Sequence, residues 1–342
     1  MANRGFAMKD PALTVGEGGG AGCQPWTIRQ PPDTLSERVQ KNSAGDYVAL
    51  SGDADSLLQN HRVRGVAEFE DWDARRLTIN QAFRGILLAN GLTTFAALFR
   101  VAGGEVVRIV GSRSTARIVL TSATGPQAFY LKRHERPQVL DRIKPLLHLS
   151  WPILGARNEF EAILRFHAVG IPTMTPVAFG ESQGLSLLLT QDLGTDLTLR
   201  DWVNEKTGQQ ADGQHEAAAD GFSLKRRVIA HVAQIARKMH DCGLHHQDFY
   251  LNHLLWCGDP AGLDIRVIDL GRVCHSSRLT WRWVIKDLAQ LDFSARNLAC
   301  HDRLRFLRLY LGRPFRASDR WLIRQIICKS RNIASHTAKN GL

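Results

Sequence analysis

Residues 245–256 read HHQDFYLNHLLW, and residues 265–272 read IRVIDLGR. The first run follows a long amphipathic stretch that predicts a helix, and it ends in the apolar Leu254-Leu255-Trp256, which predicts a short buried element. The second run is β-branched and apolar, typical of a strand, and leads into an acidic residue. Each run therefore places one carboxylate, Asp248 or Asp269, in a loop that borders a buried element.

These two runs resemble, in the same order along the chain, the catalytic loop (H-R-D-x-x-x-x-N) and the metal-binding D-F-G segment of protein kinases. The resemblance implies that Asp248 orients the nucleophilic hydroxyl and that Asp269 holds Mg²⁺. Counting from Asp248 puts His253 at the kinase asparagine, while Asn252 lies one residue earlier. Because imidazole is a poorer Mg²⁺ ligand than an amide oxygen, both residues remain candidates for the second metal position.

Upstream, three short runs rich in β-branched and aromatic residues lie between Val101 and Lys132 and predict an antiparallel meander. They read EVVRIVG, ARIVLT and AFYLK. Lys132 ends the third run, where a protein kinase places the lysine that contacts the α- and β-phosphates of ATP. Glu159, in the helix predicted next, is the preferred carboxylate partner of this lysine. Glu161 is the competing choice, because it points from a different face of the helix.

Two further segments are candidate nucleotide contacts. The turn Gly111-Ser112-Arg113-Ser114-Thr115 would cover the phosphates through backbone amides, serine hydroxyls and the charge of Arg113. It has one glycine where protein kinases have three. Thr190-Gln191-Asp192-Leu193 is predicted to be the hinge between two lobes, so that backbone groups from Thr190 to Asp192 would hydrogen-bond an adenine ring.

The order of the remaining patterns predicts the fold class. Helical spacing in NEFEAILRFHAVG is followed by two expected strands, TPVAFGE and LSLLLTQDL, and then by a long helix in SLKRRVIAHVAQIARKMHDCG that ends at Gly243. We expect an α+β, protein-kinase-like two-lobed fold with a small β-rich N-lobe and a larger helical C-lobe. The N-lobe is predicted over residues 61–193, with an antiparallel sheet and one helix, and the C-lobe over residues 194–342.

The N-terminal part of the chain has weaker patterns. Residues 1–60 are rich in Gly, Pro, Asp and Ser without sustained periodicity, and we expect them to be mostly flexible. Residues 68–91 fit either a helix or a packed leader to the first strand.

Bulk composition excludes several classes of protein. The 342 residues, 44% of them apolar, suffice for a two-lobed core. No apolar run reaches the roughly 18 residues of a membrane-spanning helix, and the N-terminus lacks the pattern of a signal peptide. Six cysteines without a CxxC pair fit a reducing cytosol. The formal charge of +11 and the pI near 9.7 predict attraction to polyanions but do not choose among them.

A more specific resemblance rests on HHQDFYLNHLLW, VIDLGR and RWVIKDLAQLDFSA, the last of which contains Lys286-Asp287, expected to pack behind the catalytic loop. Together they resemble the lipopolysaccharide core heptose kinases and related Kdo kinases of Gram-negative bacteria. The likeness runs from FYLKRH, ARNEFEAILRFHAVGIPTMTPVAFGE and LLLTQDL to FLRLYLG and SDRWLIRQI, over residues 68–332. A histidine at 253 is expected in that family, whereas Gln247 replaces its usual arginine and Gly271 stands where histidine is frequent.

The resemblance implies ATP and Mg²⁺ as cofactors and, as acceptor, a heptose or Kdo hydroxyl of the lipopolysaccharide inner core or another anionic glycolipid. It also implies a cytoplasmic enzyme with peripheral contact at the inner membrane surface and no specific nucleic acid partner. A basic C-terminal surface would face such an acceptor; its residues are Arg303, Arg305, Arg308, Arg313, Arg316, Arg320, Arg324, Lys329 and Arg331. Alternatives on the same fold are a protein or small-molecule kinase, or an envelope-associated pseudokinase.

Overall fold

The computed structural model describes residues 62–63, 67–135, 155–211, 218–259 and 262–339. Residues 1–60, which the sequence predicts to be flexible, lie outside the described residues.

The N-terminal half is built on an eight-stranded sheet with the order β1-β2-β3-β7-β8-β6-β5-β4, in which every neighbouring pair is antiparallel. The predicted meander is confirmed as β4, β5 and β6, and the two later predicted strands are confirmed as β7 and β8. The bounds are β1 (Arg62–Val63), β2 (Ala67–Trp72), β3 (Leu77–Asn80), β4 (Glu105–Val110), β5 (Arg113–Ser122), β6 (Gly125–His134), β7 (Pro176–Ser182) and β8 (Leu185–Gln191).

The region before the meander differs from the prediction. Instead of a helix or an irregular leader, residues 67–80 form the β2–β3 hairpin. Its turn consists of Asp73, Ala74 and Arg75, all with positive φ (51°, 53° and 65°) and none of them glycine, so the usual turn signal is missing from the sequence. The short helices α2 (Arg84–Ala89) and α3 (Phe95–Phe99) follow, so the N-lobe has more than the one helix predicted.

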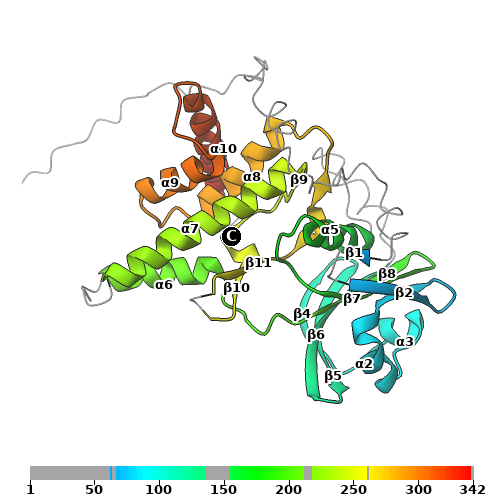
Figure 1. The fold of residues 1–342 in the computed structure, drawn as a ribbon. Coiled ribbons are helices and arrows are strands. Elements are labelled where there is room, and N and C mark those ends of the chain that lie inside the picture. The colour runs from blue at the N-terminus through cyan, green and yellow to red at the C-terminus, as the bar shows by residue number, and fades with distance from the viewer. Residues whose placement is uncertain (1–61, 64–66, 136–154, 212–217, 260–261, 340–342) are drawn as a thin grey trace, which may run out of the picture. The chain divides into compact units, whose positions relative to one another are not determined.

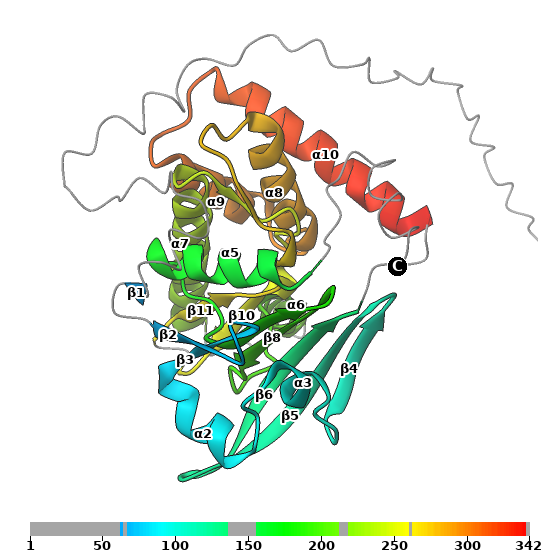
Figure 2. The same cartoon turned by 90° about the vertical axis from the view of Figure 1, so that its right-hand side faces the viewer.

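The sheet has an apolar core on each face, which explains why its central strands read as continuous hydrophobic runs. On β8, Leu187 and Leu189 belong to the cluster that includes α2 and α3, whereas Leu188 belongs to the cluster that includes Phe160 of α5. Helix α5 (Arg157–Ala168) therefore covers the face opposite α2 and α3, and it lies between the sheet and the helical elements in Figure 2.

The C-terminal half is mostly helical (Figure 1). The long helix ends as predicted, because Gly243 has φ 71° and a Cβ there would lie 2.3 Å from the carbonyl oxygen of Ser276. None of the described helices is long and apolar enough to cross a membrane. The helices are α6 (Leu199–Ala211), α7 (Ala218–Asp241), α8 (Trp281–Ser294), α9 (Cys300–Leu311) and α10 (Asp319–Lys339).

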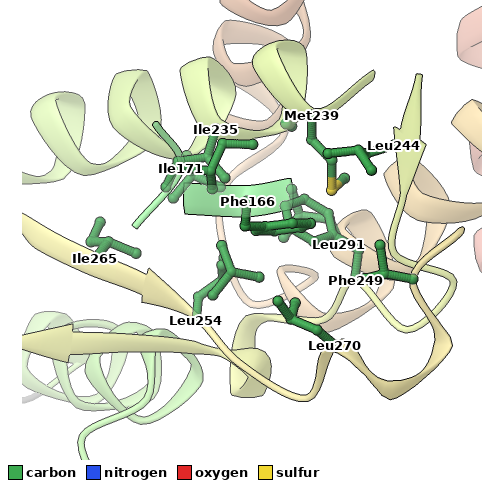
Figure 3. Packing of buried hydrophobic residues seen from close by; sticks show 14 of the residues in the cluster. Phe166, Ile171, Ile235, Met239, Leu244, Phe249, Leu254, Ile265, Leu270 and Leu291 are labelled. Carbon is green, nitrogen blue, oxygen red and sulfur yellow. The ribbon is translucent and has the colours of Figure 1, made fainter. Parts of the chain in front are cut away.

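Two small antiparallel pairs lie among these helices. β10 (Leu254–Cys257) pairs with β11 (Asp264–Val267), and β9 (Leu244–His245) pairs with β12 (Cys274–His275). The side chains that follow the two predicted site acids, Phe249 and Leu270, are fully buried among the apolar residues of α5, α7, α8 and the β10–β11 pair (Figure 3). Burial of these neighbours anchors each acidic loop at the lobe surface.

Candidate active site

Strand pairing explains why two acids distant in sequence come together. Leu254 at the start of β10 lies opposite Val267 at the end of β11, so the loop before β10 and the loop after β11 leave the pair at the same end. His245 and Cys274 pair in the same way on the outer side of these loops. Asp248 and Asp269 are therefore carried by adjacent loops that are closed by strand pairs on both sides.

Helix α8 holds the Asp248 loop through hydrogen bonds to its backbone. Asp287, with no exposed surface, accepts from the amides of His246 (2.7 Å) and Gln247 (2.8 Å). Gln290, one turn later, accepts from the Phe249 amide (3.0 Å) and donates to the Gln247 carbonyl (2.7 Å). Asp287 thus packs behind the loop as predicted, and it acts by fixing the backbone.

His240, near the end of α7, contacts the Asp287 carboxylate. Its Nε2 lies 3.3 Å from Asp287, and its Nδ1 lies 2.9 Å from the Tyr310 hydroxyl. Burial alone would raise the pKa of Asp287, but the hydrogen bonds and charge of His240 and the contacts with His246 outweigh burial and leave the pKa below its usual range. Asp287 is therefore ionised and acts only as an acceptor.

His246 connects the two acidic loops. Its Nδ1 accepts from the Asp248 amide at 3.3 Å, and its Nε2 lies 3.1 Å from the Ile268 carbonyl, the residue before Asp269. Burial lowers the pKa of His246, which keeps the ring neutral with its proton on Nε2. A single neutral ring thereby sets the spacing between the two loops.

Lys132 of β6 pairs with Glu159 of α5 within the N-lobe and lies near Asp269 of the C-lobe. Lys132 Nζ lies 2.6 Å from Glu159 Oε1 and 4.0 Å from Asp269 Oδ1. Burial alone would lower the pKa of Lys132, but the two carboxylates more than offset this and raise it. Glu161, the competing choice, lies near Arg157 instead (4.0 Å). The structure therefore brings Glu159, and not Glu161, to the lysine.

Asp269 occupies a backbone conformation that turns its carboxylate into this region. Its φ is 57°, in the left-handed region that Asp tolerates better than most residues, and its side chain is 44% exposed. Burial alone would raise its pKa, but the charge of Lys132, then of His253 and His246, lowers it. The loop is held by α5, because Asn158 donates to the Gly271 carbonyl (2.7 Å) and the Val273 carbonyl (3.1 Å).

Of the two candidates for the second metal position, the structure places His253 beside Asp269. His253 Nδ1 lies 2.7 Å from the Asp248 carbonyl oxygen, and its Nε2 lies 3.7 Å from Asp269 Oδ2. A carbonyl only accepts, so Nδ1 carries a proton and Nε2 faces the carboxylate. Asn252 lies in the single 3-10 turn Leu251–His253 that precedes β10.

The phosphate turn is shorter than the sequence predicts. Gly111 (φ 57°) and Ser112 form a two-residue connection between β4 and β5, and the Ser112 carbonyl accepts from the Glu135 amide at 2.8 Å. At the predicted hinge, Thr190 is buried and paired within the sheet. The Asp192 amide donates to Ala128, and its carboxylate pairs with Arg117 at 2.8 Å. These groups of Asp192 are therefore already engaged.

Two arginines that lie near the site were not predicted from the sequence. Arg108 lies opposite Thr115, which lies opposite Lys132, so all three project to the same face of the sheet. Arg272, in the run VIDLGR, places Nη1 at 3.2 Å and 3.3 Å from the two carboxylate oxygens of Asp248. The register of β4 on β5 places Arg108 at the site, and the conformation of its loop places Arg272 there.

The basic C-terminal surface is only partly available to a ligand. Arg303 pairs with Asp292 (2.9 Å), Arg305 lies 3.5 Å from the buried Asp302, and Arg313 pairs with Asp319 (2.7 Å). Arg303 joins α9 to α8, Arg305 contacts a residue of its own helix, and Arg313 contacts the first residue of α10. The prediction that the whole set forms one acceptor surface is therefore wrong for these three arginines.

A β-rich lobe with a lysine–glutamate pair, set over a helical lobe with two loop aspartates, defines a protein-kinase-like phosphotransferase. Comparison with known sequences narrows this class. The protein-family model described as "Lipopolysaccharide kinase (Kdo/WaaP) family" matches residues 104–310 of the chain. The chain belongs to this family, as the sequence resemblance predicted, and it is accordingly a kinase with the two-lobed α+β fold expected.

The relatives cover most of the chain. The chain is 33% identical over 270 residues to "Lipopolysaccharide core heptose(I) kinase WaaP" of Escherichia coli (strain K12), which covers 75% of this chain and 96% of the relative. It is 34% identical over 256 residues to the protein of the same name from Pseudomonas aeruginosa, with coverage of 70% and 88%. A solved structure described as "WaaP in complex with acyl carrier protein" is 31% identical, with a TM-score of 0.57 and coverage of 75% and 98%.

Proposed function

We propose that this chain transfers the γ-phosphate of ATP to a heptose hydroxyl of the lipopolysaccharide inner core. The proposal is supported by the names of its curated relatives and by one geometric observation. Lys132, already paired with Glu159, lies 4.0 Å from Asp269, whose loop is connected to that of Asp248 through His246 and His253. Cation and carboxylates thus converge as phosphoryl transfer requires.

Each side chain has a distinct role in this proposal. Asp248 accepts the hydrogen bond of the acceptor hydroxyl and orients its oxygen for in-line attack. Lys132, held by Glu159, binds phosphate oxygens of the nucleotide. Arg108 adds a second cation on the same face of the sheet, where the two-residue turn at Gly111 offers few amides. Arg272 lies beside Asp248, with 3.2 Å between Nη1 and a carboxylate oxygen.

The residues present fit a magnesium ion held mainly by nucleotide phosphates. Within the described ranges, no three His, Cys, Asp or Glu side chains gather as a metal site of their own. Mg²⁺ usually takes one or two protein carboxylates and completes its shell with phosphate and water, and Asp269 supplies one exposed carboxylate. Bound there, the ion would neutralise phosphate charge. His253 Nε2, which lies 3.7 Å from Asp269 Oδ2, would keep that carboxylate oriented.

The test is transfer of labelled phosphate from ATP to deacylated inner-core oligosaccharide that lacks the heptose phosphate. We expect product with the wild-type chain and a loss of at least about 10²-fold in kcat for Asp248→Ala. Asp241→Ala, an exposed carboxylate at the end of α7, is the matched control and should keep full activity. Label found only on protein would favour the protein-kinase alternative, and no Mg²⁺-dependent ATP turnover would favour the pseudokinase.

Peripheral contact with the inner membrane also remains part of the proposal, and it rests on the net positive charge. Its test is flotation with vesicles that contain anionic lipid. Binding to neutral vesicles of equal strength would contradict the charge argument.

An acyl carrier protein, a partner that the sequence did not predict, is proposed as well because the solved relative is described in complex with one. The supporting observation is a cavity of about 400 Å³ among α6, α7, α8, α9 and α10. Its lining is largely apolar, including Val228, Leu291 and Ile326, and it also contains the basic side chains Lys225 and Arg303. An acyl chain suits such a lining.

This partner is tested by comparing the affinity for acylated and unacylated carrier protein. Ala334 lines the cavity, whereas the exposed Ser335 does not. Ala334→Trp should abolish the preference for the acylated form and Ser335→Trp should retain it. Equal binding of both forms by the wild-type chain would remove the cavity from the proposal.

A further inference from the structure

Positive charge is concentrated beside Asp248 and on α8, the helix that supports its loop. Arg272 pairs with Asp248 at 3.2 Å. Lys286 of α8 places Nζ 3.5 Å from the Gln247 side-chain oxygen, directly before Asp248 in sequence. Lys329 of α10 is close enough to Lys286 to affect its titration. Arg272 and Lys286 therefore lie at the loop that carries Asp248, and Lys329 belongs to the helix that packs on α8.

Lys286 is the most informative of these residues. It is half-buried, and neither it nor Lys329 has a carboxylate partner within 4.0 Å in the described part of the chain. Its neighbour Asp287 is buried and already accepts from two backbone amides and His240. Burial, followed by repulsion from Arg272, lowers the pKa of Lys286. Lys286 Nζ also lies over the Trp283 ring, 5.5 Å from its centre, but a ring does not neutralise a partly desolvated cation beside Arg272, so binding of an anion there is favourable.

The location separates this cluster from the nucleotide. The phosphate side of the site already has Lys132 and Arg108, which share a face of the sheet. The second cluster meets the site at Arg272, which contacts Asp248, and at Gln247, which adjoins it in sequence. Asp248 is the residue that orients the acceptor, so these cations lie on the acceptor side.

We propose that Arg272, Lys286 and Lys329 form an anion-binding subsite for the acceptor, which recognises a carboxylate or phosphate carried near the hydroxyl that is phosphorylated. This inference rests on the proposed function, because it assigns a substrate group to the same site. Binding of the anion would also draw Arg272 away from Asp248 and leave the carboxylate free for the hydroxyl.

The experiment measures kcat/KM for three forms of the deacylated inner-core oligosaccharide: untreated, with carboxylates methyl-esterified, and with existing phosphates removed. The wild-type chain should prefer the untreated form over one neutralised form by about tenfold or more, the usual worth of a charged hydrogen bond. The form that loses activity identifies the anion as carboxylate or phosphate. In Lys286→Met and Lys329→Gln this preference should fall toward one, and Lys286→Arg should restore it.

The ratio of activities distinguishes recognition from a structural effect, because a poorly folded variant loses activity on all three forms equally. Arg200→Gln is the control, since it removes the same charge at an exposed position of α6, a helix that contributes none of the three cations. Its preference should match the wild type. An unchanged preference in both lysine variants, or no preference in an active wild-type chain, would overturn the proposal. Absence of transfer to every form by the wild type would instead refute the proposed function.

Discussion

Replacement of Asp287 by alanine should damage both stability and catalysis, although this side chain has no exposed surface and contacts no substrate. The carboxylate accepts two amide hydrogens of the catalytic loop, at 2.7 Å and 2.8 Å, and a third contact from His240 at 3.3 Å. Hydrogen bonds to a charged acceptor are worth about 1.5–3 kcal/mol each, and alanine leaves two buried amides without a partner. We therefore expect a loss of about 3–5 kcal/mol in the free energy of unfolding.

Two variants separate this effect from general disturbance. Asp287→Asn keeps one acceptor oxygen and should lose about half as much stability. Asp241→Ala breaks an exposed pair on α7 and should cost less than about 0.5 kcal/mol. Stability is measured by urea denaturation, and phosphoryl transfer by steady-state kinetics at a temperature where all variants are folded. Because the loop that carries Asp248 would be displaced, kcat should fall at least about tenfold. If Asp287→Ala unfolds within about 1 kcal/mol of wild type and keeps its kcat, the positioning role is wrong.

Other perturbations test separate parts of the structure. Lys132→Met should lower kcat/KM for ATP by about 10²-fold and leave the buried Glu159 unpaired, so adding Glu159→Gln should recover thermal stability but not activity; recovery of both would contradict the phosphate role. Arg108→Gln should raise the KM for ATP several-fold in steady-state assays, whereas the exposed Arg320→Gln should not; equal effects would remove Arg108 from the nucleotide site. Burial lowers the pKa of His134 and His245 to about 4, so the unfolded chain binds more protons below pH 6.5, and urea denaturation should show about 2 kcal/mol less stability per ring at pH 5 than at pH 7. Asparagine at both positions should flatten that dependence. Gly243→Ala should cost more than about 1 kcal/mol in the same assay, because φ is 71° and the added Cβ meets the Ser276 carbonyl; a neutral result would mean that the chain turns differently there.

Much of the fold could be predicted because its signals are local. The strands β4 to β8 are β-branched or apolar runs separated by turns, and α5 and α7 have helical spacing with a glycine after the last turn. The β2–β3 hairpin was missed for an equally local reason. Its turn uses Asp73, Ala74 and Arg75 in left-handed conformations where glycine or asparagine would be the expected signal, and the surrounding sheet must hold them there.

The candidate site divides in a similar way. Lys132, Glu159, Asp248 and Asp269 were predicted from their order and flanking patterns, and the family followed from the same motifs. The sequence left Glu161 beside Glu159, and Asn252 beside His253, as open alternatives. Helix phase and loop conformation place Glu159 at the lysine and His253 beside Asp269. Neither choice is encoded in spacing alone.

The sequence by itself determined which elements form, their order and the residue types that phosphoryl transfer needs, because periodicity, turn residues and loop motifs act over a few neighbouring positions. Only the tertiary structure decided which charges meet. Arg108 reaches the lysine face through strand register, Arg272 reaches Asp248 through a loop closed by two strand pairs, and Lys286 meets Lys329 through packing of α8 on α10. Electrostatic interactions depend on distance in space, and a linear chain does not specify those distances until its core has formed.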